Sequence, residues 1–245
     1  MRLAILSDIH GNIWALEAVL AAIRKMGDIE MMVNPGDILS GPLEPSATAE
    51  ILMGLNLPTI AGNHERQLLR CGARPGSASD QYAFEHTSDK QREWLASLPQ
   101  TLAIRPDILM CHGSPDSDHE YLLDHISSDA VTLDSDAAIQ RKLGRHQHSL
   151  IICGHSHLPR VYQTTKGNLI VNAGSIGLQA YEDDNPVPHI VENGSPHARF
   201  SVCEETRGSW SIANYAIVYD WDKAAMMARK NGRPDWERWL LTGRV

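Results

Sequence analysis

Five short apolar runs in this chain are each followed by side chains that can bind a metal ion. Those side chains are two carboxylates, one amide and five imidazoles: Asp8, His10, Asp37, Asn63, His64, His112, His155 and His157. Such oxygen and nitrogen donors together suit Mn²⁺, Fe or Zn²⁺ better than a thiolate site does. Each motif is weak alone, because D-x-H triplets and Gly-Asp turns are common. Five of them in order, each after an apolar run, predict a metal site.

The elements that would position these side chains follow from hydrophobic periodicity. Leu16 to Ile23 places apolar residues on one helix face, and a second helix is predicted over 46–54. Buried strands are predicted by the apolar runs at 2–7, 31–33, 57–60, 108–111 and 150–153. Their alternation with helices predicts a largely parallel sheet with right-handed crossovers. The carboxyl ends of parallel strands meet at one edge, which is where such sheets form their sites.

The later part of the chain changes pattern. A hairpin pair is predicted at 161–165 and 169–172, strands at 198–203 and 215–219, a loop over 182–197, and terminal helices at 222–231 and 234–241. The change from strand–helix alternation to consecutive strands predicts an α/β layered fold in which two facing sheets are covered by helices. We expect one domain over 1–245, with a cap or insertion around 71–100 and a variable loop around 178–210.

Composition limits the partners. The formal net charge of −8 and a pI near 5.8 disfavour a nucleic-acid polymer, which usually meets a basic face. The four cysteines form no CxxC pair, which is typical of reduced thiols in a cytosolic protein. No signal peptide or apolar run of membrane-spanning length is visible. We therefore expect a cytoplasmic protein without a membrane segment, and a homo-oligomer stays open.

The ordered pattern D-x-H, G-D, G-N-H-E, H and G-H-x-H over residues 8–157 resembles the calcineurin-like metallophosphoesterase family. The stretch N-A-G-S-I-G at 172–177 resembles a further segment of its small prokaryotic members. The resemblance implies a β-sandwich flanked by helices, with the metal site at the C-terminal ends of strands. It implies two divalent ions, Mn²⁺ first, with Fe, Zn, Ni or Co as alternatives. One ion would be held by Asp8, His10, Asp37 and His157, and the other by Asp37, Asn63, His112 and His155.

The same resemblance implies hydrolysis of a phosphodiester or phosphomonoester of a small molecule. A hydroxide bridging the two metals would attack, and His64 would assist the leaving group. Asn63 and His64 would contact the substrate, and Asn12 would either do so or simply cap the following helix. Three alternatives remain open: a dinucleoside polyphosphate hydrolase, a catalytically silent metal-binding scaffold, and a nuclease.

Several residues depart from the family pattern or lie outside it. Protein phosphatases of the family carry an aspartate three residues after the bridging aspartate, and purple acid phosphatases carry a tyrosine there. Here the residue is Ser40, so we expect neither phosphoprotein activity nor tyrosinate–iron colour, and the partner of His64 is unidentified. Side chains expected to lie outside the site are His86, His146, His148, Asp183, Asp184, His189, His197, Trp236 and Trp239. His119 and His125 are the two that could still line a pocket.

Overall fold

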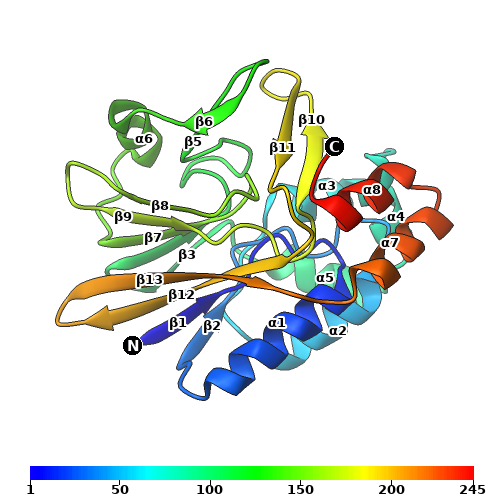
Figure 1. The fold of residues 1–245 in the computed structure, drawn as a ribbon, viewed down its shortest axis with the longest axis horizontal. Helices are drawn as coiled ribbons and strands as arrows, with labels where there is room; N and C mark the ends of the chain where they lie inside the picture. Colours follow the sequence, from blue (N-terminus) through cyan, green and yellow to red (C-terminus); the bar gives the residue numbers. More distant parts are fainter.

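Two β-sheets face one another at the centre of the molecule (Figure 1). The computed structural model describes all 245 residues. The first sheet has the order β13-β12-β1-β2, formed by β1 (Arg2–Ile5), β2 (Met31–Val33), β12 (Ala198–Thr206) and β13 (Ser209–Ile217). The second has the order β3-β4-β7-β9-β8, formed by β3 (Thr101–Arg105), β4 (Ile108–Cys111), β7 (Leu150–Cys153), β8 (Arg160–Gln163) and β9 (Leu169–Asn172).

The sheets are mixed, so the prediction of a largely parallel sheet is wrong. Only β1–β2, β4–β7 and β7–β9 pair in parallel, whereas β1–β12, β12–β13, β3–β4 and β8–β9 are antiparallel. The strands of each parallel pair are separated in the chain by at least one other element. The antiparallel pairs β3–β4, β8–β9 and β12–β13 join consecutive strands, and β12 returns late in the chain to pair with β1. The strand predicted at 57–60 is reduced to one bridge between Asn34 and Thr59.

The space between the sheets is filled by side chains of both. Leu3 and Ile5 of β1 lie in one buried cluster with Met110 of β4, Ile152 of β7 and Val171 of β9. All five are fully buried. Burying an aliphatic side chain of this size contributes about 1.5–3 kcal/mol, so this layer fixes the two sheets against each other. The loops that follow β1, β4 and β7 are held in register by the same packing.

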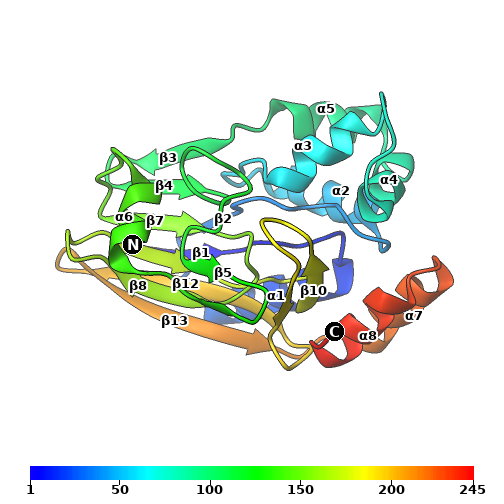
Figure 2. The ribbon, with the colours of Figure 1, turned by 90° about the horizontal axis from the view of Figure 1, so that it is seen from above.

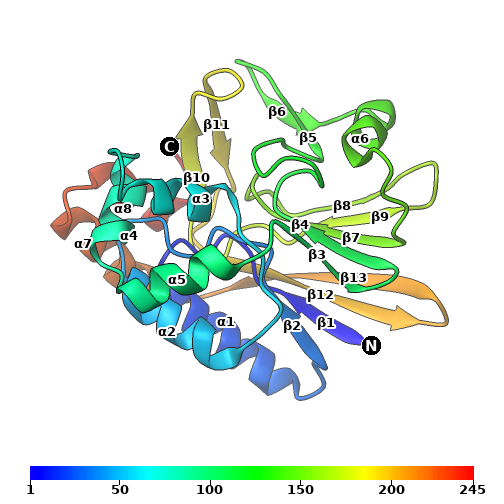
Figure 3. The same cartoon turned by 180° about the vertical axis from the view of Figure 1, so that it is seen from behind.

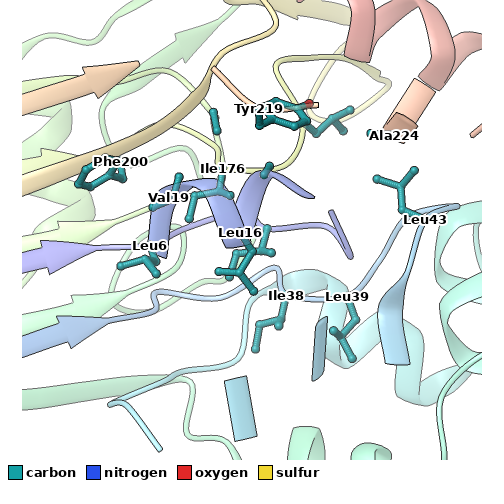
Figure 4. Packing of buried hydrophobic residues seen from close by; sticks show 14 of the residues in the cluster. Leu6, Leu16, Val19, Ile38, Leu39, Leu43, Ile176, Phe200, Tyr219 and Ala224 are labelled. Carbon is teal, nitrogen blue, oxygen red and sulfur yellow. The ribbon is translucent and has the colours of Figure 1, made fainter. Parts of the chain in front are cut away.

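A larger core is shared by the first sheet and seven helices. These helices are α1 (Ile13–Met26), α2 (Pro45–Leu55), α3 (Asn63–Arg70), α4 (Ala78–Glu85), α5 (Asp89–Ser97), α7 (Trp221–Lys230) and α8 (Pro234–Thr242). Of them, α1 packs directly against β12 and β13. Figure 4 shows Leu16 and Val19 of α1 among Ile176 and Phe200, and Ile38 beyond them. The 3.6-residue spacing that predicted α1 thus marks its buried face. Figure 3 shows α5 lying alongside α2 on this side.

The outer face of the second sheet has its own small cluster. Helix α6 (Asp136–Leu143) buries Ile139 and Leu143 against Ile151 and Ile170 of the sheet. Beside it lies the short hairpin of β5 (Asp124–Ile126) and β6 (Val131–Leu133). In Figure 2 the remaining helices gather at the end of the sheets away from the N-terminus. None of the helices is long and apolar enough to cross a bilayer.

The predicted loop over 182–197 contains a hairpin, which corrects that prediction. β10 (Ala180–Asp183) pairs antiparallel with β11 (His189–Glu192). Its sequence is rich in Asp, Asn and Pro, which hid the alternation of buried Ala180, His189 and Val191. Figure 1 shows the hairpin rising next to β5–β6 and α8. Residues 71–100 carry α4 and α5, and both helices contact α3.

Candidate metal centre

The candidate ligands come together at one edge of the two sheets. Asp8 and His10 lie in the loop after β1, Asp37 after β2, His112 after β4, and Asn63 at the start of α3. His155 and His157 lie in the loop after β7. All seven side chains are no more than 6% exposed, although none is apolar. Buried polar side chains of this kind need partners, so the loops bring them together for a bound group.

Five of these seven residues have left-handed backbones. Asp8, His10, Asp37, His155 and His157 have φ between 53° and 70°. This conformation is unfavourable for a residue with a Cβ and costs of order 1–3 kcal/mol each. The surrounding loops hold it by hydrogen bonds, such as those from the Asp8 N–H to Gly36 and from the His10 N–H to Asp37. Strain concentrated on the candidate ligands indicates a functional site.

One group of three donors consists of Asp8, His10 and His157, whose ligand atoms all lie within 4.8 Å of one another. His10 donates its Nδ1 proton to the Ser40 carbonyl, and His157 donates its Nδ1 proton to the Leu178 carbonyl, both at 2.7 Å. In these tautomers the Nε2 atom of each ring carries a lone pair and no proton, yet the two atoms face each other at 3.1 Å. Two acceptors at that distance need a cation between them, and carbonyl-oriented imidazoles are the usual metal ligands. This group therefore fits a divalent metal.

The second group consists of Asp37, His112 and His155, with ligand atoms again within 4.8 Å. His112 donates from Nδ1 to the Pro35 carbonyl at 2.8 Å, which turns Nε2 toward Asp37 Oδ2 at 3.0 Å and Asn63 Oδ1 at 3.1 Å. His155 donates its Nε2 proton to the His119 carbonyl at 3.1 Å, so the lone pair of its Nδ1 is available to a metal ion. Asn63 thus lies beside His112 of this group, at the place where the family resemblance implies a further ligand.

The charges at the centre favour ligand forms that bind metals. Burial and the neighbouring His157 imidazole lower the pKa of His10 to about 3, and burial and His112 lower that of His155 to about 3. Both imidazoles are therefore neutral at pH 7. Burial opposes ionisation of Asp37, but the surrounding imidazoles outweigh it and hold its pKa well below the usual range. The centre thus offers ionised carboxylates and, at His10 and His155, neutral imidazoles. Burial lowers the pKa of His112, but the Asp37 carboxylate outweighs it and raises the pKa to about 10, so a divalent ion at this position would displace the His112 proton.

The close packing of the G-D and G-N-H motifs explains their glycines. A Cβ on Gly62 would lie 2.2 Å from Asp37 Oδ1, so only glycine lets α3 approach this carboxylate. The same Asp37 oxygen accepts the backbone N–H of His64 at 3.0 Å. Asp37 is thereby positioned by the loop that supplies Asn63.

His64 has a carboxylate partner that sequence analysis did not identify. Its Nδ1 lies 2.8 Å from Oδ1 of Asp80, in the first turn of α4. Burial lowers the pKa of His64, but the carboxylates of Asp37 and Asp80 outweigh it and raise the pKa to about 9. No sequence motif connects residues 64 and 80, and only the packing of α4 against α3 joins them.

Asn12 occupies the N-cap of α1 and faces the protein interior. Its side-chain oxygen accepts the Ala15 N–H, and its amide donates to the Gly177 carbonyl and the Tyr219 hydroxyl. The residue is fully buried, and both polar atoms of its side chain are bonded inside the protein. Of the two interpretations of Asn12, these hydrogen bonds support the N-cap.

A cavity of about 360 Å³ opens onto the two groups of donors. Five of the seven candidate ligands line it together with His64, whereas Asp8 and His112 lie behind them. Other lining residues are Ser77, His119, Tyr121, Tyr181, Arg233 and Trp236. His119 therefore lines the site, and His125 does not. Tyr121 and Tyr181 lie against His155 and His157, with ring centroids 4.4 and 4.8 Å away. Neither tyrosine follows an apolar run in a motif, so sequence reasoning missed both.

Three further side chains differ from expectation. His189 was expected in a surface loop, but it is buried and its Nε2 lies 3.0 Å from the Tyr121 hydroxyl. Asp183 was expected outside the site, yet it lines the rim of the cavity. Trp236 packs in the core as predicted and also reaches the cavity, with its ring 6.0 Å from that of His10.

Comparisons with known proteins agree with this fold and identify the family. The model of the calcineurin-like phosphoesterase superfamily domain matches residues 1–191, and the chain belongs to that family. An uncharacterized protein of Methanocaldococcus jannaschii is 27% identical over 249 residues, covering 96% of this chain and 94% of that protein.

Three solved structures show the same fold. A metallophosphoesterase from Sphaerobacter thermophilus has a TM-score of 0.76 at 22% identity, covering 99% of this chain and all of that one. A hypothetical protein from Pyrococcus horikoshii has a TM-score of 0.75 at 19% identity, covering 99% and 98%. A putative diadenosine tetraphosphatase has a TM-score of 0.54 at 18% identity, covering 87% and 93%.

Proposed function

We propose that this protein hydrolyses a phosphate ester of a small molecule with the help of two divalent metal ions, Mn²⁺ in the first place. The observation that carries this proposal is that one cavity is lined by members of both groups of metal-competent side chains and by a further imidazole, His64, that belongs to neither group. Two ions in such a centre clamp the phosphoryl oxygens and make water a nucleophile near neutral pH.

The chain's own residues divide the remaining work. Asp8, His10 and His157 would hold one ion, and Asn63, His112 and His155 the other. Asp37 would bridge them, since its carboxylate lies beside His112 while its backbone carbonyl accepts the His10 N–H. The neutral amide of Asn63 leaves more net positive charge for the phosphate than a third carboxylate would. His64 is placed to donate a proton to the departing oxygen from Nε2, because its Nδ1 is occupied by Asp80.

The cavity favours a substrate with one phosphoryl group. Its volume of about 360 Å³ suits a small molecule. Arg233 is the only arginine or lysine that lines it, and the guanidinium is already bound to Asp235 through Nε and Nη2. A second or third phosphate group of a substrate would therefore have no unpaired arginine or lysine to bind. The Glu182 and Asp183 carboxylates, which also line the cavity, would repel it. This disfavours dinucleoside polyphosphates and nucleic acids as substrates.

The intact His64 distinguishes an enzyme from a metal-binding scaffold. A scaffold needs the ligands alone, whereas a half-buried imidazole paired to a buried carboxylate beside the cavity serves proton transfer. We also propose the cytoplasm as its compartment, because all four cysteines are free and buried.

The test is hydrolysis by chelator-stripped protein with and without Mn²⁺. p-Nitrophenyl phosphate, bis-p-nitrophenyl phosphate and diadenosine tetraphosphate are compared side by side. We expect Mn²⁺ to restore turnover of at least one aryl ester, and the faster of the two distinguishes monoester from diester chemistry. Binding of two ions without hydrolysis of any phosphate ester would favour the scaffold, and preferred hydrolysis of the tetraphosphate would contradict the single-phosphoryl proposal.

A further inference from the structure

Asp80 is the only protein group bonded to a side-chain nitrogen of His64. Its Oδ1 lies 2.8 Å from Nδ1, and its side chain is 2% exposed. No protein atom bonds Nε2 of His64, which lines the cavity with the rest of the ring. The carboxylate therefore fixes which nitrogen of His64 faces the reaction space.

The Asp80 carboxylate is itself held from two sides. Ser77 donates its hydroxyl to Oδ2 at 2.6 Å and accepts the Asp80 N–H at 3.1 Å as the N-cap of α4. Burial opposes ionisation of Asp80, but the bonds from His64 and Ser77 outweigh it and lower its pKa. The carboxylate is thus an ionised, oriented acceptor for the His64 Nδ1 proton.

The C-terminal helices support the helix that carries Asp80. Arg233 donates from Nη1 to the Ser79 hydroxyl at 2.7 Å, and Asn231 donates to the Tyr82 hydroxyl at 2.8 Å. Both donors lie beyond residue 191, where the family match ends. The position of α4, and with it that of Asp80, is therefore supported both by α3 and by side chains beyond the matched residues.

Ser40 cannot perform this task. Its hydroxyl is buried, carries no charge and has no hydrogen-bond partner, so it does not bond His64. Its backbone carbonyl is used to orient His10. Of the groups around His64, only Asp80 combines a negative charge with a bond to Nδ1.

We propose that Asp80 is the positioning residue of the reaction, holding the His64 ring so that Nε2 presents its proton to the leaving oxygen. This inference rests on the proposed function. It makes residues 77–80 part of the catalytic arrangement, although they lie in the segment that the sequence suggests is a cap. Asp80 acts through His64 and does not touch the substrate itself.

The test compares Asp80→Asn with a matched control, Asp89→Asn. Both residues lie in the first turn of a neighbouring helix, but Asp89 is exposed and pairs only with Arg92. Asp80→Asn keeps the shape and an acceptor oxygen while removing the charge. We expect Mn²⁺ content and KM to stay as in wild type. kcat should fall about tenfold or more on an alkyl phosphate ester, whose leaving oxygen needs a proton, and much less on a p-nitrophenyl ester.

A second readout does not depend on activity. In ¹H–¹⁵N spectra of metal-stripped and Mg²⁺-loaded protein, the His64 Nδ1 proton bonded to a carboxylate should give a downfield resonance. It should be absent in His64→Gln, lost or shifted far upfield in Asp80→Asn, and unchanged in Asp89→Asn. If Asp80 only stabilised helix α4, its replacement by asparagine would leave this resonance unchanged.

The possible outcomes distinguish failure of the positioning role of Asp80 from failure of the proposed phosphoesterase function. If wild type hydrolyses esters but Asp80→Asn matches it on the alkyl substrate, the positioning role is overturned and the proposed function stands. An equal loss on alkyl and aryl esters, with an unchanged resonance, also overturns it. If wild type hydrolyses no ester with any divalent metal, the proposed function fails and the inference fails with it, even where the resonance shows the pair.

Discussion

The carboxylate of Glu65 lies directly behind Asp37 and holds its backbone. Oε2 accepts the Asp37 N–H at 2.9 Å, and Oε1 accepts the N–H of Ile38 at 2.8 Å. Oε2 also accepts the N–H of Gly62 at 2.8 Å, where α3 begins. One buried side chain therefore joins the loop after β2, with its left-handed Asp37, to the loop that carries Asn63 and His64.

Removing this carboxylate should destabilise the protein. Glu65→Ala would leave three buried N–H groups without an acceptor, at about 1–3 kcal/mol for each group left unpaired. We expect urea unfolding of the metal-stripped protein to show a loss on the order of 3–5 kcal/mol, less than the simple sum because the loops can relax toward water. Glu65→Gln keeps one oxygen and should lose less.

Glu17→Ala is the matched control, because Glu17 is exposed on α1. Its unfolding free energy should lie within about 0.5 kcal/mol of wild type. A Glu65→Ala protein as stable as this control would mean that the three N–H groups find other partners.

Asp37→Ala should abolish metal binding at both positions. Its carboxylate belongs to the second donor group and would bridge both ions in the proposed centre, and His112 loses its anionic neighbour with it. We expect mass spectrometry of dialysed protein to find close to no bound Mn²⁺, and ester hydrolysis to fall to background. Asp129→Ala, at an exposed loop, should keep the wild-type metal content. Two ions per chain in Asp37→Ala would contradict a bridging role.

Two groups of metal-competent side chains could be expected from the sequence because most of their members follow strand ends. The strands predicted at Ile108–Cys111 and Leu150–Cys153 are present with those bounds. The position of a side chain that directly follows a buried strand is largely fixed by that strand. The parallel pairing of β4 with β7 then brings His112 and His155 to the same edge. Local pattern and topology agree on where these side chains lie, whereas their division between two ions came from the family resemblance.

The supporting groups could not be predicted for the opposite reason. Asp80 and Arg233 meet the site through the packing of helices, and residue spacing does not determine which turn of α4 faces α3 or α8. The β10–β11 hairpin was missed because its turn residues resemble an irregular loop. The strand predicted at 57–60 failed since an apolar run alone does not supply a pairing partner.

Gly177 should tolerate no side chain. A Cβ there would lie 1.8 Å from the Ile9 carbonyl oxygen, and the Gly177 N–H donates to the Asp8 carbonyl at 3.0 Å. Gly177→Ala must therefore push the loop of Asp8 and His10 out of place. We expect a loss of about 2 kcal/mol or more in unfolding free energy, together with weaker Mn²⁺ binding.

Gly54→Ala is its control. Gly54 lies within α2, has an ordinary backbone, and a Cβ there would meet nothing within 4 Å. Alanine at this position should raise the unfolding free energy by about 0.5–1 kcal/mol, because it has the better helix propensity. Equal stabilities of Gly177→Ala and Gly54→Ala would contradict the close approach of Gly177 to Ile9.

Arg105 ties the two sheets together and should make stability depend on acid pH. Its guanidinium bonds Asp107 through Nη2 at 2.6 Å and Glu205, on β12 of the other sheet, through Nη1 at 2.7 Å. The bond to Arg105 lowers the pKa of Asp107 to about 2, and Arg105 likewise lowers the pKa of Glu205. A carboxyl with a depressed folded-state pKa stabilises the fold above its unfolded pKa and loses that contribution as pH falls toward the folded value.

Arg105→Gln should therefore be less stable than wild type at pH 6, and the gap should narrow as pH falls from about 4.5 toward 2. A remainder should persist, because the guanidinium also lies 5.5 Å over the Trp210 ring, and this packing does not titrate. The measurement is the urea midpoint of chelator-stripped wild type and variant at pH 6, 4 and 3. The control is Arg24→Gln, an exposed residue at the end of α1, whose gap should stay the same at each pH. If the Arg105→Gln gap is also constant with pH, the two carboxylates do not depend on Arg105 for their charge, and the link between the sheets is packing alone.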